Sequence, residues 1–419
     1  MPSALPSGQA HDRLSQKGPR DMTSMVHGGD LEGVRTRLGL GDRPLLDFSV
    51  SFNPLGPPPA ALAAARKALD QIVHYPQPGT PRLAERIAEA HRVPVDRVIV
   101  GAGTTELIGL VAQSLREVLA LHARELGDPA MPLSHLVEPT YTEYRRVSRR
   151  NDLRLETWNK HALGWEQDFL PRSAAGIFWT GHPNNPTGRA WDRDRLLGLV
   201  DDTQGLLTVV DEAYLPFLPD EDERTVTTAV ADRDNLLVLR SLTKIFSFPG
   251  LRVGYAVASA DMVERLTQFQ DPWSVSQPAE AAALAALDDD EYLERTRELI
   301  ATEAARLTDH LWDLPGIRPA WPERQRPASA PPVPNYVLVS LTETRWTSMQ
   351  VFEALARRGI LVRECSDIPG LEIGSLLTGP GQLVASRGHL RFAVRTRAEN
   401  DQLLAALREV LMTSNGKLG

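Results

Sequence analysis

The amino-acid sequence predicts an α/β protein in which a mostly parallel sheet lies between layers of helices. Short apolar runs, typical of strands, alternate with amphipathic helical stretches from Val93 onward, as expected for strands joined by helical crossovers. Four of these runs end directly in a glycine-bearing or polar motif. Ligands of open α/β sheets bind beyond the carboxyl ends of the strands, so the four motifs are expected to meet at one site.

Two helices and a strand come before the first motif, "GAGTTE" (101–106). The amphipathic helices cover about 60–72 and 82–93 and flank the segment "HYPQPGTP". The strand "RVIV" at 97–100 runs into "GAGTTE", which opens a long helix over "LIGLVAQSLREVLALHA". The first motif therefore links a strand to the start of a helix.

Three further strands carry the remaining motifs. "GIFWT" (176–180) runs into the loop "GHPNNPTG", "LLTVV" (206–210) runs into "DEAY", and "LLVL" (236–239) runs into "RSLTK". "RVGYAVAS" (252–259) is one more strand. These segments complete the predicted large domain.

The pattern of the chain changes after Pro272. A long helical region from about Ala279 to Leu311 is followed by a proline-rich loop at 319–334. The strand "NYVLVSL", the helix "SMQVFEALARRG" and the strands "ILVRE" and "HLRFAVR" predict a second, smaller α/β domain. The predicted parts are a disordered tail, a segment packing on the small domain, the large domain and the small domain: 1–24, 25–58, 59–272 and 273–415.

Composition excludes several classes of protein. With 419 residues, 42% hydrophobic and 24% charged, the chain is long enough for two domains and has the composition of a soluble globular protein. A net charge of −8 and the lack of a Lys/Arg block argue against nucleic-acid binding. No run approaches the roughly 18 apolar residues of a membrane span, and the polar first residues lack the apolar core of a signal peptide. We therefore expect a cytoplasmic location.

The residues that most often bind metals are sparse or badly spaced. The single cysteine, Cys365, excludes an internal disulfide and a thiolate cluster. The ten histidines show no metal-ligand spacing. No metal is expected.

Lys244 stands in "RSLTKIFSFPGLRVGY", among apolar residues just after a strand. A lysine is rarely buried without a partner, because a bare ammonium group in a dry site is very unfavourable. One interpretation is that its stem packs on apolar neighbours while the amine reaches water. The other is that burial lowers the pKa of the amine and makes it a nucleophile that forms a Schiff base with a cofactor.

Asp211 ends the apolar strand 206–210, where a carboxylate is unfavourable unless it is paired. It is either a cap or turn residue, or a group that keeps a pyridine nitrogen protonated so that the ring withdraws electrons. The presence of Lys244 favours the second interpretation. In the same way, "PNNPTG" (183–188) is a plain turn or a pair of inward-facing amides, and Tyr214 fills the core or binds a ring oxygen.

"GAGTTE" (101–106) places backbone N–H groups at a helix N-terminus, where an anion binds. It does not match the dinucleotide fingerprint, since Glu106 takes the place of the third glycine and no clear acidic strand end follows about 20 residues later. A single phosphate fits better. The hydroxyls of Ser241 and Thr243 and the guanidinium of Arg252 are expected to share it.

"VVDEAY…RSLTKIFSFPGLRVGY", preceded by "PNNPTG", resembles the fold-type I pyridoxal-phosphate (PLP) enzymes of the aspartate-aminotransferase superfamily, from about His27 to Leu411. The resemblance implies a seven-stranded sheet in the large domain, PLP as the cofactor and a homodimer with active sites at its interface. It also implies that Lys244 binds the aldehyde of the cofactor and that Asp211 pairs with the pyridine nitrogen. The other implied cofactor contacts are Tyr141 on the ring face, Asn185 and Tyr214 at the phenolic oxygen, Gly103, Thr104, Thr105, Ser241, Thr243 and Arg252 at the phosphate, and Tyr75 across the dimer interface.

Two branches of the superfamily resemble the chain most, the threonine-phosphate decarboxylases and the histidinol-phosphate aminotransferases. "HGGD" (27–30), "LLDFSVSFNPLGPP" and "LVRECSDIPGL" look like segments of the decarboxylases, although "HGGD" alone is also a plain turn. The resemblance places His27 near the substrate phosphate and Arg363 and Arg391 at the substrate, where a guanidinium pairs with a carboxylate. Asn53 is a further expected substrate contact.

Three hypotheses of function follow. The first is PLP-dependent decarboxylation of O-phospho-L-threonine to (R)-1-amino-2-propanol phosphate for cobalamin side-chain synthesis. The second is an aminotransferase that acts on histidinol phosphate or another amino acid with 2-oxoglutarate. The third is a PLP-binding regulator without catalysis, which the short polar N-terminus and the negative net charge disfavour. The stretches 124–136, 319–334 and 372–388 look inserted relative to the family, and the last lies beside the substrate arginines.

Overall fold

The computed structural model describes residues 28–126, 133–159, 176–320, 334–374, 376–379 and 382–412. The predicted tail 1–24 and the predicted substrate residue His27 lie outside these residues, as do parts of all three stretches predicted as insertions. Within the described part of the chain, none of the helices combines the length and the apolar character needed to cross a membrane.

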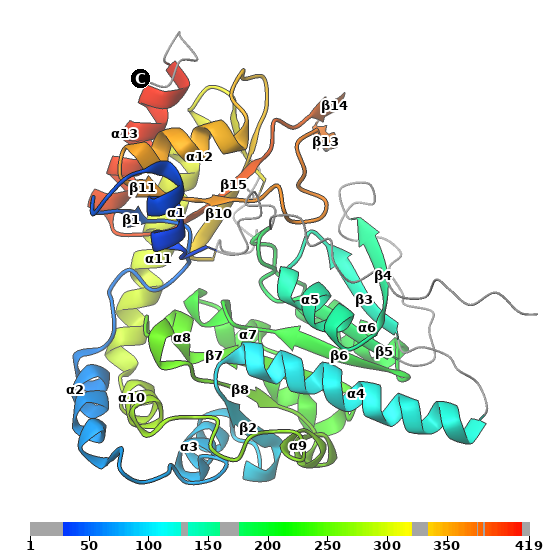
Figure 1. The fold of residues 1–419 in the computed structure, drawn as a ribbon. Helices are drawn as coiled ribbons and strands as arrows, with labels where there is room; N and C mark the ends of the chain where they lie inside the picture. Colours follow the sequence, from blue (N-terminus) through cyan, green and yellow to red (C-terminus); the bar gives the residue numbers. More distant parts are fainter. Residues whose placement is uncertain are drawn as a thin grey trace, which may run out of the picture.

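A seven-stranded sheet forms the centre of the larger part of the molecule (Figure 1). Its strands follow the order β2-β8-β7-β6-β5-β3-β4, and only β8 runs antiparallel to its neighbours. The strands are β2 (Val98–Gly101), β3 (Leu133–Glu138), β4 (Arg154–Asn159), β5 (Gly176–Gly181), β6 (Leu206–Asp211), β7 (Leu236–Ser241) and β8 (Gly254–Val257). The predicted mostly parallel, seven-stranded sheet is confirmed.

Strands β2, β5, β6, β7 and β8 are buried on both faces, which is why they read as largely apolar runs, whereas the edge strand β4 is partly exposed. Successive side chains of a strand point to opposite faces. In β6, Val210 therefore packs in one core cluster, whereas Leu207 and Val209 pack in the other. Helices α4 (Thr104–Leu126), α5 (Thr142–Arg150) and α9 (Ala260–Thr267) supply the second cluster, and α3 (Pro81–His91) and α6 (Arg193–Asp202) contribute to the first.

A second sheet of four antiparallel strands lies above the first in Figure 1, with the order β12-β15-β10-β9. Its strands are β9 (Ile317–Pro319), β10 (Tyr336–Leu341), β12 (Arg363–Glu364) and β15 (His389–Ala393). Helices α12 (Ser348–Arg357) and α13 (Arg397–Met412) accompany it, and the long α11 (Asp290–Trp312) extends between the two sheets. The chain between β12 and β15 contains a hairpin of β13 (Leu376–Gly379) and β14 (Gln382–Ala385).

The predicted single strand "ILVRE" is wrong in detail. Its first half is β11 (Ile360–Leu361), which pairs in parallel with β1 (Leu46–Asp47), and its second half is β12, which pairs with β15. The chain passes from one sheet to the other at Val362 because the N-terminal segment supplies the partner of β11. No local pattern in the sequence marks this change of partner.

The N-terminal segment connects the second sheet to the loop of Lys244. After α1 (Leu31–Leu38) and β1, the backbone N–H of Ala393 donates to the carbonyl oxygen of Phe48 at 2.9 Å. A few residues later, the N–H of Asn53 donates to the carbonyl oxygen of Lys244 at 3.1 Å. The segment then enters α2 (Pro59–Ala68), which packs against α10 (Gln277–Leu287).

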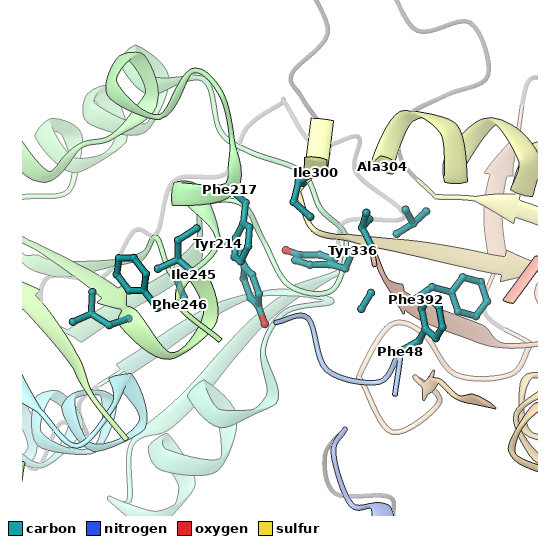
Figure 2. Packing of buried hydrophobic residues seen from close by; sticks show 14 of the residues in the cluster. Phe48, Tyr214, Phe217, Ile245, Phe246, Ile300, Ala304, Tyr336 and Phe392 are labelled. Atoms are coloured by element: carbon teal, nitrogen blue, oxygen red, sulfur yellow. The ribbon is translucent and has the colours of Figure 1, made fainter. Parts of the chain in front are cut away.

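The apolar core continues from one sheet to the other (Figure 2). Tyr214 and Phe246 lie on the side of the large sheet, and Tyr336 and Phe392 on the side of the small one. Ile300 of α11 belongs to the same buried cluster. The two sheets therefore share apolar contacts, and the division of the chain near residue 272 stays a prediction.

Candidate active site

The direction of the strands brings the four sequence motifs to one edge of the large sheet. Strands β2, β5, β6 and β7 all end at this edge, and β8 begins there because it runs in the opposite direction. Gly254 at the start of β8 pairs with Gly101 on one side and with Ser241 on the other. The segments that follow Gly101 and Ser241 therefore meet Arg252, which precedes Gly254.

These three segments form a cradle of hydrogen-bond donors. Gly103 has a φ of +81°, and a Cβ atom there would lie 2.5 Å from Nη2 of Arg252, so the guanidinium packs directly on bare backbone. Arg252 itself has a φ of +56°, a strained conformation for a residue with a side chain. The hydroxyls of Ser241 and Thr243 lie 2.9 Å apart beside them. With the N-terminus of α4, this donor set fits a phosphate group.

Lys244 lies in α8 (Leu242–Ile245), a single helical turn that follows β7 directly. The side chain is partly buried, and its amine lies 4.7 Å from the centre of the Phe52 ring. Burial, followed by the positive charges of Arg391 and Arg252, lowers the pKa of Lys244 to about 8, while Asp211 opposes this shift. A substantial fraction of the amine is therefore neutral near pH 8, which is the form that attacks an aldehyde.

Asp211 is buried at the end of β6, and both of its carboxylate oxygens accept a hydrogen bond. Oδ1 accepts from the backbone N–H of Ala213 at 2.9 Å, and Oδ2 accepts from the hydroxyl of Tyr144 at 2.9 Å. Burial raises the pKa of Asp211 above its ordinary value, and the two hydrogen bonds and Lys244 act against that rise. The carboxylate is thus held at a fixed place near Lys244, as a partner for a pyridine nitrogen must be.

Two tyrosines, Tyr141 and Tyr214, lie close enough to Asp211 for its negative charge to contribute to the rise of their pKa. Tyr141 is the N-cap residue of α5 and hydrogen-bonds the side chain of Thr105. Tyr214 is buried and meets Tyr336 edge to face, with ring centroids 4.9 Å apart. Burial raises the pKa of both Tyr141 and Tyr214, so both phenols stay neutral and able to donate.

The two predicted substrate arginines lie opposite each other on two neighbouring strands of the second sheet. Arg363 and Arg391 are direct partners in the β12–β15 register. Arg391 donates from Nη2 to the carbonyl oxygen of Ser49 at 2.8 Å and from Nη1 to Oδ1 of Asn185. Arg363 donates from Nη2 to Asp367 at 2.8 Å. Like charges directly opposite one another are unfavourable, so a bound anion between them is stabilising.

The side chains of two further predicted residues make their contacts elsewhere in this chain, and a third residue lies outside the described part. Both amide hydrogens of Asn53 are used elsewhere, by the carbonyl oxygen of Ile245 at 2.8 Å and by Oγ1 of Thr296 at 2.7 Å. Tyr75 is 78% exposed and packs on Trp273, 4.8 Å between ring centroids. His27 lies outside the described residues. Their roles at the substrate or the cofactor stay predictions.

Three further residues of the site were not predicted: Tyr144, which binds Asp211; Phe52, which faces Lys244; and Tyr336, whose ring centre lies 5.4 Å from the Arg391 guanidinium. The spacing in "YTEY" was a usable signal for Tyr144, because residues three apart share one face of a helix. Tyr336 lies inside an apolar strand and gives no such signal.

A buried ion network fixes the strand ends that carry the site. Nη2 of Arg240, next to Ser241, lies 2.7 Å from Oε2 of Glu212, next to Asp211. Arg240 also pairs with Glu221, which pairs in turn with Arg297 of α11. Removing one partner of a buried pair costs on the order of 3–5 kcal/mol, because the other charge is left uncompensated. The network therefore ties β6, β7 and α11 together behind the site.

The observed groups fit one cofactor. A phosphate-sized cradle, a nucleophilic amine, a buried carboxylate and an aromatic ring at a helix start lie at one edge of the sheet, and buried Nε of Arg391 has no hydrogen-bond partner there. Among the described residues, no group of three or more His, Cys, Asp or Glu is arranged to hold a metal ion. The fold is that of a fold-type I PLP enzyme, and the groups at this edge of the sheet fit PLP.

Comparison with known proteins gives the family. The sequence matches the family "Aminotransferase class I and II" over residues 43–407. It is 32% identical to threonine-phosphate decarboxylase of Salmonella typhimurium over 92% of this chain and 96% of that protein. It is 33% identical to histidinol-phosphate aminotransferase of Symbiobacterium thermophilum over 94% of this chain and 97% of that protein. The chain therefore belongs to the class I and II aminotransferase family, and its cofactor is pyridoxal 5′-phosphate.

Solved structures show the same fold. L-threonine-O-3-phosphate decarboxylase from Porphyromonas gingivalis has a TM-score of 0.72 and 23% identity, over 87% of this chain and 98% of that chain. Histidinol-phosphate aminotransferase from Sinorhizobium meliloti, solved with pyridoxal 5′-phosphate, has a TM-score of 0.73 and 20% identity, over 96% of this chain and all (100%) of that chain. Both kinds of activity thus occur on this architecture.

Proposed function

We propose that the protein is a PLP-dependent decarboxylase that converts O-phospho-L-threonine to (R)-1-amino-2-propanol phosphate for cobalamin side-chain synthesis. The observation that carries the proposal is the facing pair of Arg363 and Arg391. Two guanidinium groups suit a substrate with two anionic groups, a carboxylate and a phosphate, as phosphothreonine has. Histidinol phosphate has one anionic group, its phosphate. The 32% identity to a threonine-phosphate decarboxylase also supports the proposed decarboxylase activity.

Each side chain has a defined task in this proposal. PLP, when it is bound, supplies an electron sink for the bond that breaks. Lys244, with a pKa of about 8, holds the aldehyde of the cofactor and then moves a proton at the substrate Cα. Asp211 holds a proton on the pyridine nitrogen. Arg391 binds the substrate carboxylate, and the direction in which it holds that group selects the bond at Cα that stands perpendicular to the ring.

The decarboxylase proposal makes a direct prediction. Purified holoenzyme is expected to release CO2 from O-phospho-L-threonine at the same rate with and without 2-oxoglutarate, because decarboxylation needs no amino acceptor. The measurement is CO2 evolution together with detection of the amine phosphate. Unphosphorylated threonine is the control substrate and is expected to react much more slowly. Transfer of nitrogen to 2-oxoglutarate without CO2 release overturns the proposal.

The second candidate is an aminotransferase that acts on histidinol phosphate or another amino acid. The 33% identical relative favours it. The arginine pair is also compatible with it, since two guanidinium groups suit the two carboxylates of 2-oxoglutarate. The same Lys244, Asp211 and phosphate cradle serve both reactions. The assay with and without 2-oxoglutarate separates the two candidates.

We further propose a homodimer, working in the cytoplasm without a membrane or nucleic-acid partner. An apolar surface surrounds Tyr75: Val73 is 82% exposed, Ile72 62%, Leu69 53% and Trp273 46%. A second copy is the occupant that would cover these side chains and bring Tyr75 toward the neighbouring active site.

The dimer predicts that Val73→Arg dissociates the protein. The wild type is expected to sediment as a dimer at micromolar concentration, and Val73→Arg as a monomer with reduced activity, since a buried charge opposes the apolar contact. Val95→Arg is the matched control, because Val95 is also an exposed valine, at 50%, and lies outside the segment 69–75. A monomeric wild type that is fully active contradicts the dimer.

A further inference from the structure

Tyr144 is a buried phenol aimed at the carboxylate of Asp211. It is 2% exposed, and its hydroxyl oxygen lies 2.9 Å from Oδ2 of Asp211. An ionised carboxylate only accepts hydrogen bonds, so the phenol is the donor. Hydrogen bonds to charged groups are among the stronger ones in proteins. None of the expected cofactor or substrate contacts includes this residue.

The alternation of side chains in β6 explains why these two residues meet. Asp211 is in phase with Leu207 and Val209, so its side chain lies on the sheet face that α4 and α5 cover. Tyr144 belongs to the same apolar cluster and comes from α5. Had the strand been one residue out of register, the carboxylate would face the opposite layer.

The ring of Tyr144 is held between two aromatic side chains. It stacks on Trp179 of β5, with centroids 5.3 Å apart and planes inclined by 12°. Its other contact is edge to face with Tyr141, 5.5 Å between centroids and 89° between planes. Because Tyr141 and Tyr144 are three residues apart at the start of α5, one short helix positions both the expected ring-stacking side chain and the donor to Asp211.

We propose that Tyr144 is a positioning residue, which donates to Oδ2 while Ala213 N–H donates to Oδ1 and so leaves the Asp211 carboxylate ionised and oriented toward the pyridine nitrogen of PLP. This inference rests on the proposed role of Asp211 at that nitrogen. Tyr144 acts only through Asp211 and does not touch the reacting atoms.

The energetic reason is the burial of Asp211. Burial alone favours the protonated acid and raises the pKa of Asp211, and the Tyr144 hydroxyl is one of the two hydrogen bonds that oppose this rise. Without the phenol, the carboxylate keeps one donor and takes up a proton more readily. A neutral Asp211 no longer stabilises a positive charge on the pyridine ring, so the cofactor becomes a weaker electron acceptor.

The decisive variant is Tyr144→Phe, which removes one oxygen atom and keeps the ring between Trp179 and Tyr141. Two readouts apart from turnover report on the cofactor: the dissociation constant of PLP, and the ¹⁵N chemical shift of pyridine-labelled PLP followed against pH. Loss of a charge-assisted hydrogen bond is expected to weaken PLP binding by roughly 10- to 100-fold. The pH at which the pyridine nitrogen loses its proton is expected to fall by about one unit.

The matched control is Tyr255→Phe. Tyr255 is also a buried tyrosine, but it belongs to the other core cluster of the large sheet, and its hydroxyl lies 2.7 Å from Nε2 of His91. This variant loses a buried hydroxyl as well, so it is expected to lower stability while the PLP affinity and the ¹⁵N titration stay at the wild-type values. A purely structural role of Tyr144 predicts the same result for Tyr144→Phe and overturns the proposal.

Two further measurements complete the test. Incorporation of 3-fluorotyrosine at position 144 keeps the shape of the side chain and makes its hydroxyl a stronger donor. The pH at which the pyridine nitrogen loses its proton is therefore expected to rise, opposite to the fall expected for Tyr144→Phe. This measurement tests the proposal even if Tyr144→Phe does not fold. Asp211→Asn tests the underlying role. If Asp211→Asn leaves the ¹⁵N titration unchanged, the proposed function of Asp211 fails. If only Asp211→Asn changes it, the inference on Tyr144 alone is wrong.

Discussion

Lys244→Ala is expected to lower turnover of the substrate by at least about 10³-fold, because the amine both holds the cofactor and moves a proton at Cα. The fold is expected to persist, since the partly buried amine with its lowered pKa adds nothing to stability at neutral pH. Reduction of the holoenzyme with borohydride, followed by peptide mapping, is expected to find PLP fixed on position 244 in the wild type and nowhere in the variant.

The pH dependence of this labelling follows from the pKa of about 8. The protonated amine below this pH cannot attack the aldehyde, so capture of PLP by the apoprotein is expected to rise with pH and level off above about 8. In the unfolded chain the amine keeps its ordinary, higher pKa, so the unfolded state binds the extra proton and the apoprotein gains stability as the pH rises between the two values. Lys67→Ala is the control, because Lys67 is exposed on α2. Normal turnover by Lys244→Ala contradicts the site.

Arg391→Leu is expected to reduce kcat/KM for a carboxylate-bearing substrate by roughly 10²- to 10³-fold, as losses of 2–5 kcal/mol are typical when a buried hydrogen-bonded charge pair is broken. The side chain is buried, donates to Ser49 and Asn185, and lies 5.4 Å from the Tyr336 ring. Much of the loss is expected in KM. The measurement is steady-state kinetics together with PLP affinity, which is expected to change less.

Arg395→Leu is the matched control for this prediction. Arg395 follows the same strand, lies 5.7 Å from the Phe48 ring and pairs with Glu399 at 2.7 Å, so it has a comparable structural role away from the proposed substrate position. Its removal is expected to lower stability and to leave kcat/KM within a few-fold of the wild type. Equal losses of kcat/KM in both variants contradict substrate binding by Arg391.

Much of the fold could be predicted because five strands of the large sheet are buried on both faces and stand out as apolar runs, whereas β3 and the partly exposed β4 carry polar residues and were not predicted. The strand pairing could not be predicted equally well. "ILVRE" divides between two sheets because β1, more than 300 residues earlier in the chain, pairs with its first half. Such a change of partner depends on contacts between distant segments, and a local pattern contains no information on them.

The candidate site divides in the same way. Lys244, Asp211 and the phosphate cradle were visible in the sequence, because each polar group directly follows a strand and the ends of parallel strands meet at one edge. For Tyr144 the sequence contains only its spacing from Tyr141, since its contact with Asp211 depends on the side of β6 that faces α5. Asn53 binds Ile245 and Thr296, and Tyr75 packs on Trp273 within the chain, so the roles that the family resemblance implies for these two residues stay predictions.

The sequence by itself determined the chemical groups of this protein and their order along the chain: a lysine, a carboxylate, hydroxyls and arginines, each at the end of an apolar strand or beside one. The tertiary structure alone decided how they act on each other. The antiparallel β8 brings Arg252 to the phosphate cradle, and Arg391 reaches Asn185 from 206 residues away. The pKa of Lys244 is set by burial and by these distant charges. Electrostatic effects and hydrogen bonds depend on distance in space, which only the folded chain defines.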